Sequence, residues 1–167
     1  MLGWAIKELG HSEAGFTQMR ESLTEYRRLG MALDLPWHLG LLAQASGDRG
    51  EVADGLAILD QAEEIIRTNV RRSLHLPEWH RIKGELLVAK QWQDEAEQSL
   101  LLSLALAGEK GARGLELRAA MSLARLRRDQ GRRTEARDLL APVYGWFTEG
   151  FDTPDLKEAR ALLDELT

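Results

Sequence analysis

The sequence predicts an all-α fold, an α-α superhelix of about four antiparallel helical hairpins that ends in a capping helix. The first observation behind this prediction is the composition. The 167 residues are 44% hydrophobic and 29% charged, and only four are proline. Alanine, leucine, glutamate and arginine dominate, and their side chains lose little freedom in a helix. The second observation is an internal repeat, which is typical of stacked helical hairpins.

Small residues mark this repeat at spacings of 40, 41 and 40 residues. They are Gly15, Gly55, Ala96 and Ala136. Four positions after each of these residues stands a large apolar residue: Met19, Leu59, Leu100 and Leu140. Twelve positions before each of them stands a second small residue: Gly3, Ala43, Gly84 and Ala124. Small residues on two neighbouring helices let their backbones approach closely. The columns therefore predict one tight helix crossing in each copy.

A further column of the repeat lies five positions before Gly15, Gly55, Ala96 and Ala136. It contains Gly10, Gly50, Gln91 and Gly131. A helix must stop here and the chain must reverse, and glycine adopts the left-handed conformation of such turns at least cost. We therefore expect a left-handed residue between the two helices of each hairpin.

The helices predicted from apolar spacing follow in order along the chain. They cover 2–9, 12–29, 35–46, 51–70, 77–90, 93–109, 114–130 and 133–147, and a last helix covers 154–166. We expect one repeat domain over 1–167, with copies at about 1–30, 35–70, 77–111 and 114–147 and a cap at 153–166. Thr153 is the expected N-cap of the last helix, and Pro154 suits its first turn.

The small and large columns resemble the tetratricopeptide repeat (TPR) pattern of a Leu-Gly in the first helix and an Ala-x-x-x-Phe in the second. The first signature stands here as Leu2-Gly3, Leu42-Ala43, Lys83-Gly84 and Leu123-Ala124. The period is about six residues longer than the usual 34, and the aromatic and proline positions of the pattern are mostly absent. The resemblance implies a non-catalytic scaffold for protein–protein interaction.

A narrower resemblance involves three runs, at 84–87, 116–126 and 144–153. They resemble the C-terminal repeat region of large bacterial signalling proteins, which join a nucleotide cyclase or DNA-binding domain to a signalling ATPase. This implies a sensory or regulatory repeat module whose catalytic domains lie upstream. The short first helix, which lacks the opening turns of the other copies, indicates a fragment of a longer chain. The alternative is a native first repeat that begins short.

Composition excludes several classes of function. Without cysteine there is no disulfide, thiolate metal site or cysteine nucleophile. A net charge of −5 argues against nucleic-acid binding, and no apolar stretch approaches the roughly 18 residues of a membrane span. Since no secretion signal precedes the repeats, we expect a cytoplasmic location.

Catalytic and metal sites are also disfavoured. His75 and His80 flank Glu78, but a spacing of five does not place both histidines on one helical face, and Pro77 interrupts the segment. We interpret them as part of a loop and an exposed helix start. We therefore predict that the protein is not an enzyme and that it binds no metal ion and no cofactor.

In stacked hairpins the first helices line a concave face, where a partner usually binds. The candidate residues for a partner-binding groove are Trp4, Trp37, Gln44, Arg81, Glu85, Arg118, Arg125 and Arg128. Gly40, Glu78 and Met121 share that expected face. Arginine and tryptophan often anchor interfaces, and the three arginines near the end could receive an acidic segment. The alternative is that the arginines form a solvated face and that Trp37 packs under a loop.

The aromatic residues concentrate near the C-terminus, at Tyr144, Trp146, Phe147 and Phe151. The main interpretation is a cap that covers the last apolar face, and the alternative is a docking patch. The expected partner is a protein or peptide, or upstream domains of the same chain. The alternative function is a structural module for intramolecular packing or self-association. The sequence does not predict the oligomeric state.

Overall fold

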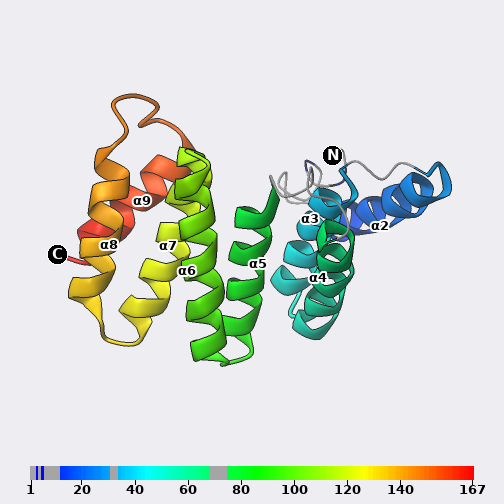
Figure 1. The fold of residues 1–167 in the computed structure, drawn as a ribbon, viewed down its shortest axis with the longest axis horizontal. Coiled ribbons are helices and arrows are strands. Elements are labelled where there is room, and N and C mark those ends of the chain that lie inside the picture. The colour runs from blue at the N-terminus through cyan, green and yellow to red at the C-terminus, as the bar shows by residue number, and fades with distance from the viewer. Residues whose placement is uncertain (1–2, 4, 6–11, 31–33, 68–74) are drawn as a thin grey trace. The chain divides into compact units, whose positions relative to one another are not determined.

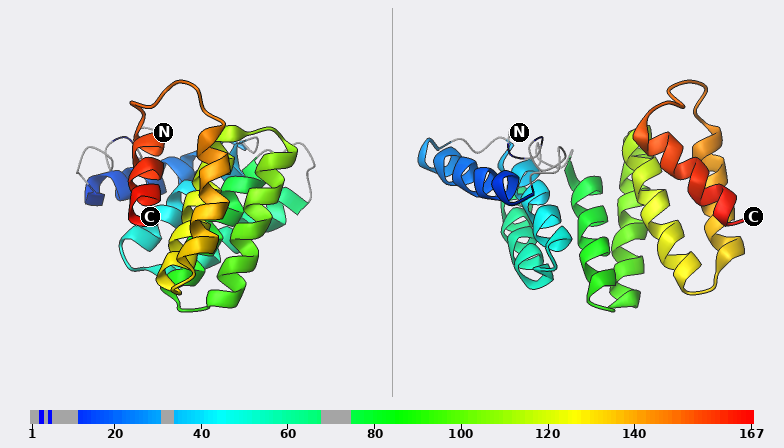
Figure 2. Two further views of the ribbon diagram at one scale, coloured as in Figure 1. Left: turned by 90° about the vertical axis from the view of Figure 1, so that its left-hand side faces the viewer. Right: turned by 180° about the vertical axis from the view of Figure 1, so that it is seen from behind.

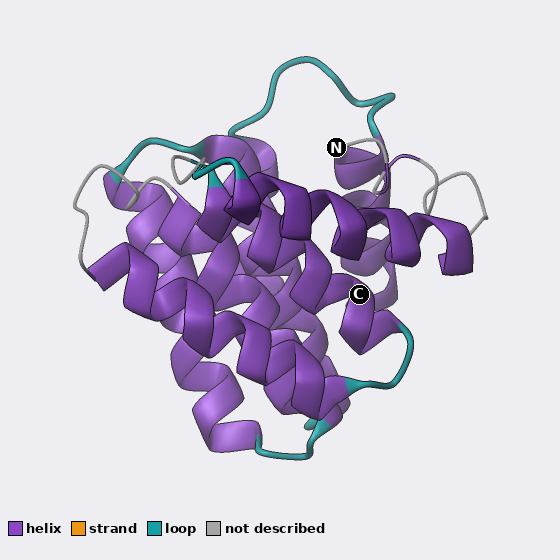
Figure 3. Cartoon of the chain, turned by 90° about the vertical axis from the view of Figure 1, so that its right-hand side faces the viewer, coloured by secondary structure: helices purple, strands orange, loops and turns teal. Residues whose placement is uncertain are grey.

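The computed structural model describes residues 3, 5, 12–30, 34–67 and 75–167, and every regular element in these ranges is a helix (Figures 1 and 3). The helices are α2 (Ser12–Arg28), α3 (Leu35–Asp48), α4 (Val52–Arg67), α5 (Leu76–Ala89), α6 (Gln93–Glu109), α7 (Arg113–Asp129), α8 (Arg133–Gly145) and α9 (Pro154–Glu165). The all-α prediction is confirmed, and the predicted helices match these bounds closely. The expected 2–9 helix lies outside the described residues except for Gly3 and Ala5, which are helical.

Two compact units make up the structure, Met1–His75 and Leu76–Thr167, and each is described by itself. In the first unit, α3 packs against both α2 and α4. In the second, each helix from α5 to α8 packs against the next, and α9 packs on α7 and α8 (Figure 2). The predicted single domain over 1–167 stays a prediction. Within the described residues, no helix combines the length and apolarity that crossing a bilayer requires.

The predicted tight helix crossings are present. A Cβ atom added to Gly84 would lie 2.5 Å from Leu100 Cγ and 3.3 Å from the Ala96 carbonyl oxygen. In the first copy, a Cβ on Gly3 would lie 2.8 Å from the carbonyl oxygen of Gly15. The matching residues of the other copies are also buried, namely Ala43, Gly55, Leu59, Ala124, Ala136 and Leu140. The small residues therefore face the interior, as the repeat pattern predicts.

The left-handed turns are confirmed in the three copies where the structure describes them. Gly50 has a φ of +81°, Gly131 has +80°, and Gln91 adopts +64° although it has a side chain. Gly10 lies outside the described residues. The backbone requirement therefore holds even where the sequence does not supply glycine.

The C-terminal cap is built mainly by the leucines of α9. Leu156, Ala159, Leu162 and Leu166 join one core with buried residues of α7 and α8, and Val143, Tyr144 and Phe147 pack against it. Trp146, in contrast, is 55% exposed. Thr153 is the N-cap residue of α9 and Pro154 lies in its first turn, as predicted. The Thr153 hydroxyl donates to the Gly150 carbonyl across 2.7 Å and makes no bond to the helix.

Candidate partner-binding face

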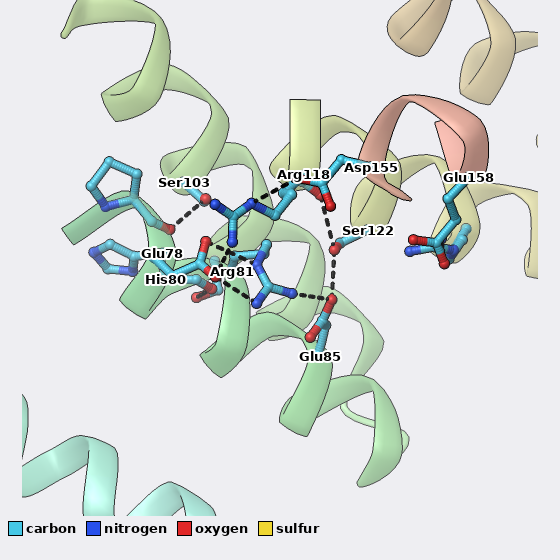
Figure 4. Close-up of polar contacts among 12 residues, drawn as sticks. Glu78, His80, Arg81, Glu85, Ser103, Arg118, Ser122, Asp155 and Glu158 are labelled. Carbon is cyan, nitrogen blue, oxygen red and sulfur yellow. Dashed lines mark hydrogen bonds and ion pairs between the residues drawn. The ribbon is translucent and has the colours of Figure 1, made fainter. Parts of the chain in front are cut away.

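The first helices of the hairpins in the second unit, α5 and α7, pack side by side. Polar side chains cross this contact in a connected network (Figure 4). At its centre Arg81 donates two hydrogen bonds to Glu78, at 2.8 and 3.1 Å, and one to Glu85, at 2.6 Å. These fork-shaped contacts hold the guanidinium in one orientation.

The same carboxylates also accept bonds from α7. Arg118 Nη1 lies 3.2 Å from Glu78 Oε1, and the Ser122 hydroxyl donates to Glu85 Oε1 across 2.6 Å. Burial alone would lower the pKa of Arg81, but the nearby Glu85 and Glu78 carboxylates outweigh it and raise that pKa above its usual value. Arg81 therefore stays charged, and the network joins two hairpins.

Two residues of this network differ from the expectation of an open groove. Glu78 is only 4% exposed and Arg81 only 6%. The carboxylates on the same helix face neutralise the guanidinium, so it can be covered without an uncompensated charge. Glu85 keeps a substantial exposed fraction and is the member of this set that a partner could reach.

The arginines of α7 meet acidic residues of α9. Arg118 Nε lies 3.5 Å from Asp155, Arg125 pairs with Glu158 at 2.7 Å, and Arg128 pairs with Glu165 at 2.6 Å. The sequence predicted that an acidic segment could bind these arginines, and the structure supplies one from the same chain. The sequence does contain the signal for these pairs, namely the acidic residues Asp155, Glu158 and Glu165 of the last helix. The sequence analysis, however, interpreted that helix only as a cap.

The remaining candidate residues do not gather into one site. The ring of Trp37 is half-buried, 5.3 Å from that of His75, and Gln44 is half-buried on α3. Gly40 is buried in α3 and Met121 lies in the core cluster, so neither presents a surface. Trp4 lies outside the described residues.

The start of α5 is also more buried than predicted. Pro77, Glu78 and Trp79 are buried, and the ring of His80 meets that of Trp79 edge-on at 4.6 Å. Burial, with a smaller effect from Lys83, lowers the pKa of His80 to about 4. His80 is therefore neutral at pH 7. In the described part of the chain, no three His, Asp or Glu residues form a group that could hold a metal ion.

Two serines of α6 anchor the carbonyl groups at the start of α5. Ser103 donates to the Pro77 oxygen at 2.6 Å, and Ser99 donates to the His80 oxygen at 3.0 Å. Both serines are buried. They support the segment that carries Glu78 and Arg81, a role that the sequence analysis did not identify.

Comparison with known proteins adds evidence on the fold. No family model matches this sequence, and no curated protein matches it. Among solved structures, a point variant of a protein assigned as a kinesin light chain from Podosopora anserina, with nearly identical TPR-like repeats, superposes with a TM-score of 0.71. The match covers 99% of this chain and 81% of that one.

The fold is TPR-like. At 20% sequence identity the likeness concerns the fold alone. It confirms the predicted class of TPR-like helical repeat.

Proposed function

We propose that this chain is a non-catalytic scaffold that binds a protein or peptide through the face formed by its first helices. The observation that carries the proposal is the fixed polar network of α5 and α7, which includes the accessible Glu85 and the partly exposed Arg118. Arg125, also partly exposed, lies on the same helix as Arg118 and pairs with Glu158 of α9. Rigid charged groups on an otherwise packed face are suited to recognising a complementary partner. The TPR-like fold supports this function by analogy only.

The finer proposal concerns the biological setting. We propose that the chain serves as the C-terminal sensory or regulatory repeat module of a bacterial signalling protein, such as an adenylate or guanylate cyclase or an ATPase-linked transcriptional regulator. The support is the sequence resemblance of 84–87, 116–126 and 144–153. Catalysis would then belong to attached domains, and the module would act in the cytoplasm.

A second candidate function is a structural module for intramolecular packing or self-association. The pairing of Arg125 with Glu158 favours it, because an arginine that could bind a partner already binds this chain. Light scattering over a range of concentrations tests self-association. A mass that stays monomeric would contradict self-association and leave binding of another protein.

The test of the main proposal uses a partner captured from the native organism, identified by mass spectrometry, and then purified for calorimetry. Arg125→Glu should weaken binding at least tenfold. The matched control is the exchange Arg125→Glu with Glu158→Arg, which restores the pair with α9 but moves the cation. If the partner contacts the Arg125 side chain directly, the exchange variant should keep the wild-type melting temperature but still bind the partner weakly. Unchanged binding by both variants would overturn the proposal.

A further inference from the structure

A pocket of about 180 Å³ lies between α2 and α3 in the first unit, beside Gly3. Its apolar walls are the side chains of Met19, Leu23 and Leu41, which are otherwise buried in the core of this unit. Cavities of about 150 Å³ with apolar walls can hold a molecule the size of benzene. The pocket therefore has room for one large aliphatic side chain.

The polar groups of the pocket favour an uncharged occupant. They are the hydroxyls of Ser22 and Tyr26 and the ring of His38, and none of the described lining residues is Asp, Glu, Lys or Arg. The His38 ring is held in place, because its Nδ1 lies 2.8 Å from the Asp34 carbonyl oxygen and the ring meets that of Tyr26 at 5.0 Å. A charged group placed here would lose part of its hydration without gaining a counter-charge.

The pocket continues into an uncovered stripe along α2. A shallower hollow shares Ser22 and Tyr26 with the pocket and extends to Leu29, which is 56% exposed. Gln18, Ser22, Tyr26 and Leu29 follow one another at spacings of four, four and three residues, so they lie on one face of the helix. The Gln18 amide donates to the Ser22 hydroxyl across 3.4 Å, and this bond is exposed. Within the described structure, Ser22 therefore bonds to its own helix.

The third copy shows what covers the equivalent stripe of α6. The offset of 81 residues between the first and third copies relates Ser22 to Ser103 and Tyr26 to Ala107. Both residues of α6 are fully buried, and Ser103 donates to the Pro77 carbonyl oxygen at 2.6 Å. The opening turns of a first helix, α5, therefore lie against this face of α6.

The second copy has the same arrangement. Its residues equivalent to Ser22 and Tyr26 are Ala62 and Ile66 of α4, and both are buried. α4 packs against α3, in which Leu39 is only 1% exposed. Leu39 lies one helical turn before the small residue of this copy, so both are on the helix face that meets α4. A leucine in the opening turns of a first helix is therefore part of this contact.

The first helix of the first copy has no counterpart of that leucine, since only two residues of the sequence precede Gly3. Paired helices run antiparallel, so a turn before Gly3 would lie against the turn of α2 that follows Met19. That turn carries Ser22 and Leu23, which line the pocket. The pocket thus corresponds to the place that Leu39 takes in the second copy.

We propose that this pocket receives the first turn of a helix from a partner protein, with a leucine side chain inserted among Met19, Leu23 and Leu41. The Ser22 hydroxyl would donate to a carbonyl oxygen of that turn, as Ser103 does to Pro77 in the third copy. The proposal rests on the proposed binding of a protein or peptide, but it uses residues other than those of the α5–α7 face. Helices that lay an apolar side chain into a groove are a common mode of peptide recognition.

The binding test uses an acetylated and amidated peptide with the sequence of residues 34–41, which are the opening turns of α3 and the residue before them. Titration of the 167-residue chain, followed by NMR, should give a dissociation constant on the order of 1 mM. The peptide variant Leu39→Asp should bind at least tenfold more weakly. In the chain, Ser22→Leu should weaken binding at least fivefold by filling the pocket. Thr17→Leu, an exposed change elsewhere on α2, should leave binding unchanged.

A second test supplies the turns from the chain itself. Adding the residues Leu-Pro-Trp-His-Leu-Gly ahead of Met1 places a leucine one helical turn before Gly3. This extension should raise the melting temperature by several degrees and abolish binding of the peptide, whereas the same extension with aspartate in place of that leucine should do neither. Arg125→Glu should leave binding of the peptide unchanged, which separates this pocket from the α5–α7 face.

Three outcomes would overturn the proposal. The first is equal binding of the leucine and aspartate peptides. The second is a Ser22→Leu variant that binds the peptide like wild type. The third is a free peptide that does not bind although the extension stabilises the chain, because the pocket would then accept only turns continuous with the first helix and not those of a partner.

Discussion

Glu78 on α5 and Arg118 on α7 form an ion pair across 3.2 Å, although 40 residues separate them in the chain. Because the sequence repeat also has a spacing of about 40 residues, these residues occupy equivalent places in successive hairpins. The pair therefore reports the stacking of one hairpin on the next. It also places Glu78 between two guanidinium groups, Arg81 and Arg118.

The buried position of this network predicts a large effect from removing Arg81. Arg81→Met should lower the free energy of unfolding by about 3 kcal/mol, because Glu78 would stay buried with one cation fewer. Adding Glu78→Gln to that variant should recover part of the loss. Arg125→Met is the control, since its partly exposed pair should contribute less than about 1 kcal/mol. Urea unfolding measures all three, and equal losses for Arg81 and Arg125 would contradict the prediction.

Replacement by alanine should affect stability differently at two glycines. Gly84→Ala should destabilise the protein by about 1–3 kcal/mol, because its Cβ would overlap the buried Leu100 side chain at 2.5 Å. Gly114 lies in α7 with open space around its Cβ position, so Gly114→Ala should leave stability unchanged or raise it by up to about 1 kcal/mol. Thermal melting of both variants makes the comparison. A neutral Gly84→Ala would contradict the tight crossing.

The left-handed conformation of Gln91 predicts that glycine is preferred there. Gln91→Gly should stabilise the protein by about 0.5–1 kcal/mol, because a side chain raises the energy of positive φ. The reverse change, Gly131→Gln, should destabilise it by a similar amount. Chemical denaturation can resolve both effects. A loss of stability in Gln91→Gly would mean that the Gln91 side chain contributes more than the strain removes.

The lowered pKa of His80 predicts a pH-dependent stability. Folding favours the neutral ring, so the stabilisation is complete above about pH 6.5 and is lost as pH falls toward the folded pKa of about 4. Wild type should therefore lose about 1–2 kcal/mol more than His80→Gln between pH 7.5 and pH 5.0. Urea unfolding at both pH values tests this. Parallel losses would show that His80 does not titrate as proposed.

The exposed position of Trp146 predicts a small role in the cap. Its ring meets Phe147 at 5.3 Å and lies 5.0 Å from the Arg113 guanidinium, yet more than half of the residue is exposed. Trp146→Ala should therefore cost less than about 1 kcal/mol, whereas Leu162→Ala in the core of α9 should cost about 2–5 kcal/mol. Differential scanning calorimetry compares them. A similar loss in both variants would support the view that Trp146 completes the cap.

The fold was predictable because its signals are local and repeated. Leu100 follows Ala96 by one helical turn in the same way that Leu140 follows Ala136, so each copy independently indicates the same crossing. The turn at Gln91 was predictable in the same way. The glycines at this position of the other copies predicted a left-handed residue there, although this copy has no glycine.

The contacts of the candidate site were less predictable because they depend on side chains that meet only after folding. Nothing in the composition of α5 distinguishes the buried Arg81 from an exposed arginine until Glu78 and α7 enclose it. Likewise, the pairing of Arg125 with Glu158 depends on how α9 lies on α7.

The serine hydroxyls that bond the start of α5 affect how the second unit can move. If α6 shifted along α5 by one helical turn, about 5.4 Å, Ser99 and Ser103 would leave the carbonyl oxygens of His80 and Pro77. Both hydroxyls are too buried for water to replace those acceptors. The two serine bonds therefore oppose sliding of α6 along α5, so this hairpin moves as one body.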